Sequence, residues 1–134
     1  MVTKGKTMKR LVFVFMAILL AAGVASAQQK SAAIVASETT HDFGDIKESA
    51  GPVSYTFKIK NEGEVPLVIT RVVASCGCTT PAWSKEPIAP SKGGEIKVTF
   101  DPNGRPGPFT KPVSVYSNGK TGSYILTIKG NVIQ

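Results

Sequence analysis

The chain is poor in the residues on which most catalytic and metal sites depend. Its 134 residues include two cysteines, one histidine and one tryptophan. Two cysteines are too few for a disulfide scaffold, so the fold must be held together by a hydrophobic core. The sequence contains no phosphate-binding loop, no paired-carboxylate pattern and no oxyanion-hole motif. These absences argue against the common classes of hydrolase and nucleotide-dependent enzyme.

Helical periodicity is also missing beyond the first 27 residues. All nine prolines and eleven of the thirteen glycines lie in this region, mostly between short runs in which apolar and polar residues alternate. The clearest run has Val53, Tyr55, Phe57 and Ile59 on one face, which is the period-two pattern of a half-buried strand. The sequence therefore predicts an all-β fold, an antiparallel β-sandwich of about seven strands in one domain.

We expect strands over residues 33–36, 41–46, 53–60, 67–73, 96–100, 113–115 and 123–132. The 67–73 run mixes the two parities, which indicates a bulge or burial on both faces. Residues 81–87, with Pro81, Trp83 and Pro87, are expected to form an irregular crossing. The Asn118-Gly119 pair predicts a hairpin, because both residues tolerate the positive φ of tight turns.

The first 27 residues have the pattern of a secretory signal peptide. Four basic residues precede an uncharged apolar run over 11–24, and Ala25-Ser26-Ala27 forms a small-residue cleavage site. The apolar run is short for a transmembrane helix. We therefore expect an exported protein, periplasmic or extracellular, with residues 1–27 removed, a tail and short first strand over 28–36, and the sandwich over 37–134.

Removal of this segment changes the charge argument. Of 16 basic residues four lie in the signal, which leaves 12 against nine acidic residues, or about +3. So small an excess of positive charge does not indicate nucleic acid binding. No transmembrane segment is expected after cleavage.

Several motifs resemble one bacterial family. They are His41-Asp42-Phe43-Gly44, then Phe57, Asn61, Gly63, Pro66-Leu67 and Ile69, then Ser75-Cys76-Gly77-Cys78-Thr79, and finally Ile88-Ala89-Pro90, Ile96–Asp101, Ser117-Asn118 and Ile128–Val132. They resemble the domain of unknown function 1573 family over roughly residues 37–133, and the Cys-Gly-Cys-Thr element is the most specific piece. The resemblance implies an exported immunoglobulin-like β-sandwich, similar in outline to pilus chaperones and major sperm protein. It implies no established activity or ligand.

Cys76 and Cys78 are the residues whose types suggest chemistry, and several interpretations stay open. In an extended strand their Cα atoms would lie about 6.6 Å apart, at the outer limit for a disulfide, although Gly77 would let the backbone buckle. Closing so short a loop stabilises a fold by only about 1.6 kcal/mol, so a bonded pair makes more sense as a redox pair than as a clamp. A structural alternative is that the cysteines are small buried residues in a turn at the end of a sheet.

A metal site and a thiol nucleophile are the other two interpretations. His41 is the third candidate ligand beside Cys76 and Cys78, whereas structural zinc usually has four ligands. A two-thiolate Cu(I) site, or a site shared between chains, stays open. A cysteine nucleophile with His41 as its base rests on residue types alone. By itself, His41 is more typical of a loop or turn residue bonded to nearby backbone.

The sequence as a whole favours a non-catalytic binding module. We expect no catalytic residues and no cofactor, and a partner that is a protein or peptide of the cell envelope or of the exterior. Sandwiches of this kind offer sheet edges for strand addition and loops for contact. The alternative function is a thiol site, redox-active or binding a soft metal, made by Cys76 and Cys78.

Export can be tested directly. We expect signal peptidase to cut after Ala27, because Ala25 and Ala27 are the small residues that the enzyme requires. Mass spectrometry of the exported protein should then find an N-terminus at Gln28. The variant Ala25→Arg with Ala27→Arg should retain residues 1–27. Recovery of the uncut wild-type chain from the cytosol would contradict this prediction.

Overall fold

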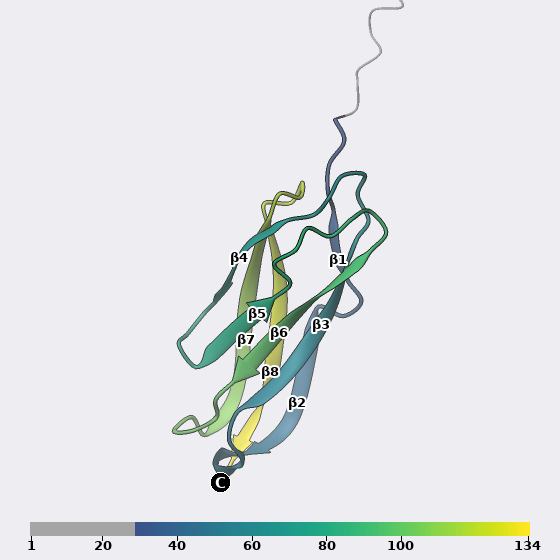
Figure 1. The fold of residues 1–134 in the computed structure, drawn as a ribbon. Coiled ribbons are helices and arrows are strands. Elements are labelled where there is room, and N and C mark those ends of the chain that lie inside the picture. The colour runs from purple at the N-terminus through teal and green to yellow at the C-terminus, as the bar shows by residue number, and fades with distance from the viewer. Residues whose placement is uncertain (1–28) are drawn as a thin grey trace, which may run out of the picture.

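The computed structural model describes residues 29–134, which form two packed four-stranded sheets (Figure 1). The first sheet has the order β1-β3-β6-β5 and the second the order β2-β8-β7-β4. In chain order the strands are β1 (Ile34–Ala36), β2 (Thr40–Lys47), β3 (Val53–Asn61), β4 (Ile69–Ala74), β5 (Thr79–Trp83), β6 (Gly93–Phe100), β7 (Gly107–Ser117) and β8 (Ser123–Ile133), and a 3₁₀ turn (Glu48–Ala50) follows β2. The all-β sandwich predicted from the sequence is confirmed, with eight strands where about seven were expected.

The core lies between the sheets and is built by the alternation read in the sequence. Phe57 and Ile59 of β3 are buried, as are Ile96, Val98 and Phe100 of β6. The second sheet contributes Val113, Val115, Leu126 and Ile128, which are also buried. Each of these side chains contributes about 1.5–3 kcal/mol when removed from water, so we expect the core to stabilise the sandwich more than a short-loop cross-link would.

One strand pair differs from the antiparallel expectation. β2 runs parallel to β8, with a register shift between Asp42 and Asp45. Parallel neighbours need a long connection, and here the chain from β2 to β8 passes through both sheets. Strand direction depends on this long-range path, so the local alternation of residues did not reveal it.

The expected irregular crossing at residues 81–87 was wrong in its first part. Residues Thr79–Trp83 form β5, and all five of them pair with residues of β6. Backbone bonds from Asp101 N–H to Cys78 O and from Ser84 N–H to Glu95 O place the even-numbered residues of β5 in hydrogen-bonded positions. Pro81 therefore faces the free edge, where its missing N–H costs no ladder bond.

A bulge explains the mixed parity of residues 67–73. The register of β4 against β7 shifts between Ile69 and Arg71, so Ile69 and Val72 both reach the core although three positions separate them. The bulge prediction is confirmed. It turns Val73 to the outer face, where this side chain is 45% exposed.

The β7–β8 hairpin is also confirmed, but Asn118 stabilises it by another mechanism than positive φ. In this turn the residue with positive φ is Gly122. The Asn118 side chain accepts a bond from Val68 N–H (2.8 Å) and donates one to Pro66 O (2.9 Å). It thus ties the hairpin to the segment that leads into β4.

Asn61, the last residue of β3, is fully buried, and its side chain makes four hydrogen bonds. Its Oδ1 accepts from the N–H groups of Ala33 (3.2 Å) and Gly63 (2.9 Å). Its Nδ2 donates to the carbonyls of Val65 (2.8 Å) and Ile88 (2.9 Å). Three segments, the chain entering β1, the turn after β3 and the loop before β6, therefore meet on one amide.

The segment that enters β1 packs closely against the turn that follows β3. A Cβ on Gly63 would collide with the backbone of Ser31 and Ala33, so the chain entering β1 lies directly against the turn after β3. The predicted signal peptide, residues 1–27, lies outside the described residues. Within residues 29–134 no helix is long and apolar enough to cross a membrane.

Asn61→Ala should lower the free energy of unfolding by about 3 kcal/mol, because it leaves buried donors and acceptors without partners. Asn118→Ala is the control, since it also removes side-chain bonds to backbone groups, two where Asn61→Ala removes four, but at an exposed site. It should cost only about 1 kcal/mol. Urea unfolding followed by circular dichroism measures both, and equal losses would contradict the role assigned to Asn61.

Candidate functional site: the Cys76–Cys78 turn

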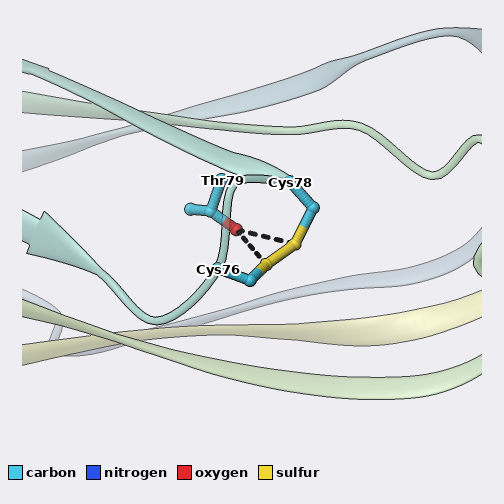
Figure 2. The surroundings of a disulfide bond; sticks show 3 residues. All are labelled: Cys76, Cys78 and Thr79. Atoms are coloured by element: carbon cyan, nitrogen blue, oxygen red, sulfur yellow. Dashed lines mark hydrogen bonds between the residues drawn. A yellow bond between two sulfur atoms is a disulfide. The ribbon is translucent and has the colours of Figure 1, made fainter.

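The two cysteines lie in the turn that carries the chain from β4 of the second sheet to β5 of the first (Figure 1). Thr79 N–H donates to Cys76 O at 3.3 Å, which closes a four-residue turn over residues 76–79. The cysteine Cα atoms are 5.3 Å apart, and a disulfide joins their sulfur atoms (Figure 2). A turn, and not an extended strand, thus brings the pair well inside the usual Cα range for a disulfide.

The disulfide lies at the rim of the core and is unevenly buried. Cys78 is 5% exposed, whereas Cys76 is half-buried and the residues on either side of it in the turn, Ser75 and Gly77, are exposed. Asp101 N–H donates to Cys78 O at 2.9 Å and fixes this end of the turn to the end of β6.

A buried hydroxyl faces both sulfur atoms. Thr79 Oγ1 is 3.6 Å from Cys78 Sγ and 3.9 Å from Cys76 Sγ (Figure 2). A disulfide sulfur carries no proton, so the single O–H proton of Thr79 is the only one available to these two contacts, and the shorter contact is the one to Cys78 Sγ. The sequence singled out the two cysteines, but the position of this hydroxyl became apparent only in the folded turn.

His41, the third candidate ligand, is not brought to the cysteine pair. His41 lies in β2, at one edge of the second sheet, whereas the cysteines follow β4, at the opposite edge. Three strand spacings, about 14 Å, separate β2 from β4. Among the described residues there is no group of three or more His, Cys, Asp or Glu side chains that could hold a metal ion.

His41 has a different environment from the loop or turn that the sequence suggested. Its ring stacks on Tyr55 of the other sheet, with centroids 3.7 Å apart, and meets the edge of Phe43. The Tyr55 hydroxyl donates to Glu38 Oε2 at 2.7 Å, and this bond raises the pKa of the Tyr55 phenol. The aromatic stack joins the two sheets at the β2 side.

The remaining residues of the His41–Gly44 motif shape the irregularity in β2. Gly44 has φ +67°, and its N–H donates to Asp42 Oδ1 at 2.8 Å. This local turn produces the register shift between Asp42 and Asp45. The contacts of the motif are therefore those of a structural element that closes the sandwich.

The outer face of the second sheet carries a feature that the sequence pattern did not predict. Val73 of β4 is opposite Ser114 of β7, which is opposite Ile125 of β8, so the three residues form a row across the sheet. Val73 is 45% and Ile125 47% exposed. Because the bulge in β4 disturbs the parity, the alternation in the sequence did not assign Val73 to this face.

The core, and not the disulfide, should supply most of the stability. The variant Cys76→Ser with Cys78→Ser should fold and lose only about 1–2 kcal/mol, because a three-residue loop gains little from cross-linking. Chemical unfolding against the oxidised wild type measures the difference. Loss of the folded state in the double variant would show that the bond is structurally essential.

Comparisons with known proteins agree with this fold. A Porphyromonas gingivalis W83 protein of unknown function superimposes with a TM-score of 0.67 at 16% identity, covering 80% of this chain and 50% of that one. The PapD-like domain 7 of human CEP192 superimposes with a TM-score of 0.63 at 10% identity, covering 82% and 92%. The Vibrio cholerae VesB protease gives a TM-score of 0.57 at 14% identity, covering 78% and 32%.

These similarities show the fold alone. The chain spans about half of the Porphyromonas protein and about a third of the protease. No curated protein matches the chain significantly. The family described as "Protein of unknown function (DUF1573)" matches residues 34–132, where the sequence motifs placed the resemblance. The chain therefore belongs to the DUF1573 family, and its fold is an immunoglobulin-like and PapD-like β-sandwich.

Proposed function

We propose that the protein is an exported, non-catalytic module that binds a protein or peptide of the bacterial cell envelope through strand β4. The observation that carries the proposal is the state of the sheet edges. Each sheet has two edge strands, β1 and β5 in the first, β2 and β4 in the second. An unprotected edge presents backbone groups that an extended peptide can pair with.

Three of these four edges carry features that oppose strand addition. β1 has only three residues, and β5 has Pro81 on its free side. β2 is interrupted at Gly44 and exposes Asp42 and Asp45. Short strands, prolines, bulges and charges all discourage pairing with another chain.

β4 is the least protected of the four edges. It contains no proline, and its charged residue is Arg71, whose guanidinium lies 4.2 Å from the Tyr116 ring centroid. The charge therefore lies over the neighbouring strand and does not project across the free edge. A bulge at the start of β4 leaves the following four residues, from Arg71 to Ala74, in regular register with β7.

The exposed row of Val73, Ser114 and Ile125 beside this edge also favours β4 as the binding surface. Val73 and Ile125 present apolar area on the outer face, where sheets usually carry polar residues. A peptide added to β4 would place alternate side chains on this face, next to Val73. Backbone pairing would supply affinity, and the apolar row would select the side chain.

Export and absence of catalysis are part of the proposal. The predicted signal peptide supports export, and a disulfide is suited to an oxidising compartment. A similarity to part of a protease does not bring an active site to this chain, since fold alone does not determine function. A lone sandwich of this type is well suited to contact and poorly suited to enclosing a substrate.

Val73→Lys tests the binding surface. A lysine at this exposed edge position should leave the fold intact and weaken partner binding at least about tenfold, since edge lysines oppose strand pairing. The matched control is Val35→Lys, which alters an exposed valine on edge strand β1. The measurement is cross-linking of tagged protein in intact cells, followed by quantitative mass spectrometry.

The proposal predicts a discrete envelope protein that is captured by the wild type and by Val35→Lys and is lost with Val73→Lys. Ile125→Lys should also reduce capture, because it removes the other end of the apolar row. Equal capture by all four proteins would refute β4 as the binding edge.

A further inference from the structure

We propose that the Cys76–Cys78 disulfide is an exchangeable redox site that accepts electrons from thiolates, which attack at Cys76. This activity is independent of the binding function proposed above, because it uses the turn after β4 and not its edge. It follows from three properties of the turn: backbone hydrogen bonds hold the turn without the disulfide, the two cysteine residues differ in exposure, and a hydroxyl faces both sulfur atoms.

The backbone of the turn is already fixed by hydrogen bonds that do not involve sulfur. The bond from Thr79 N–H to Cys76 O closes the turn, and the bond from Asp101 N–H to Cys78 O fixes it to β6. β5 continues immediately from Thr79 and pairs with β6 over five residues. Opening the disulfide therefore leaves the sandwich and the turn in place, as a reversible redox step requires.

The difference in burial between Cys76 and Cys78 determines which cysteine an incoming thiolate attacks. Cys76 is half-buried and Cys78 nearly fully buried, so an incoming thiolate reaches the sulfur of Cys76 first. The space beside Gly77 is open, since a Cβ added there would meet nothing within 4 Å. Cys78 is then the leaving group, and accessibility is one of the factors that set exchange rates.

Thr79 is placed to assist departure of Cys78. Its hydroxyl lies 3.6 Å from Cys78 Sγ, within the distance of a hydrogen bond to sulfur. When the disulfide opens, Cys78 Sγ takes the electron pair of the broken bond and becomes a thiolate. A hydroxyl donor stabilises that charge more than it stabilises the neutral disulfide, so Thr79 assists this step by direct contact with the reacting sulfur.

The complete exchange balances in two steps. A thiolate of the donor forms a bond to Cys76 Sγ as the bond between Cys76 and Cys78 breaks, giving a mixed disulfide and the Cys78 thiolate. A second donor thiolate attacks the donor sulfur of the mixed disulfide and releases Cys76. Two donor thiols are thereby oxidised to one disulfide, and Cys76 with Cys78 gains two electrons and two protons.

The first test uses the unaltered oxidised protein under native conditions. It is incubated with reduced glutathione or with dithiothreitol, and thiols are then counted by maleimide trapping. We expect two thiols per chain with an unchanged circular dichroism spectrum, and reclosure on addition of oxidised glutathione. Reduction by both reagents identifies a small thiol as a competent donor, whereas reduction by dithiothreitol alone identifies a dithiol. A bond that opens only in denaturant overturns the proposal.

The direction of attack is tested with the two single-cysteine variants. The Cys76 thiol in Cys78→Ser should react with an aromatic disulfide reagent at least about tenfold faster than the Cys78 thiol in Cys76→Ser, because it is more exposed. Equal rates, or a faster Cys78, would overturn the assignment of Cys76 as the sulfur that is attacked.

The role of Thr79 is tested by removing and restoring its hydroxyl. Thr79→Val should slow reduction of the disulfide by dithiothreitol about fivefold, the effect of one modest hydrogen bond. Thr79→Ser should restore the rate, which a purely packing role would not do. Gly77→Ala is the control in the same turn and should react like the wild type, since its φ is ordinary and its surroundings open. An unchanged rate in a folded Thr79→Val would refute the role of the hydroxyl.

Discussion

The arrangement of the segments between the strands depends on the hydrogen bonds of the buried Asn61 side chain. β-sheets hold their own strands together, but the loops between them have no ladder to satisfy their backbone groups. Asn61 supplies two acceptor and two donor contacts to such groups, at the strand that enters the sandwich, the turn after β3 and the loop before β6. Its backbone also exchanges bonds with Ser91 and Lys92. A hydrophobic residue of similar size could fill the space but would leave these groups unpaired.

The hydrogen bonds of Asn61 also affect the two proposed functional surfaces, the edge of β4 and the Cys76–Cys78 turn. The segment held between Asn61 and Asn118 leads directly into β4, so its position sets where β4 begins and how it meets β7. The bulge then rotates Val73 outward, and the strand ends at the disulfide turn. The position of β4 therefore determines both the proposed binding edge, with Val73, and the place of the disulfide turn that follows this strand.

The two most distinctive sequence motifs have different relations to function. The contacts of the His41–Gly44 motif are accounted for by folding, because its aromatic ring joins the sheets and its glycine shapes the bulge in β2. The cysteine turn is not accounted for in this way. Its backbone is held by hydrogen bonds, and its bond closes too short a loop to stabilise the fold greatly. The partial exposure of Cys76 and the small stabilising value of the bond are the observations that favour the redox proposal.

The alternation of apolar residues by itself determined the all-β class, the single sandwich and most strand positions, since each strand must bury one face against a partner sheet. The motifs by themselves determined the family. Tertiary structure alone decided the parallel pairing of β2 with β8, the strand conformation of residues 79–83 and the exposure of Val73. These depend on contacts between distant segments that local patterns do not encode. It also decided the relation of His41, Cys76 and Cys78: the sheet order places His41 at the edge opposite to β4, while a local turn brings the cysteines together.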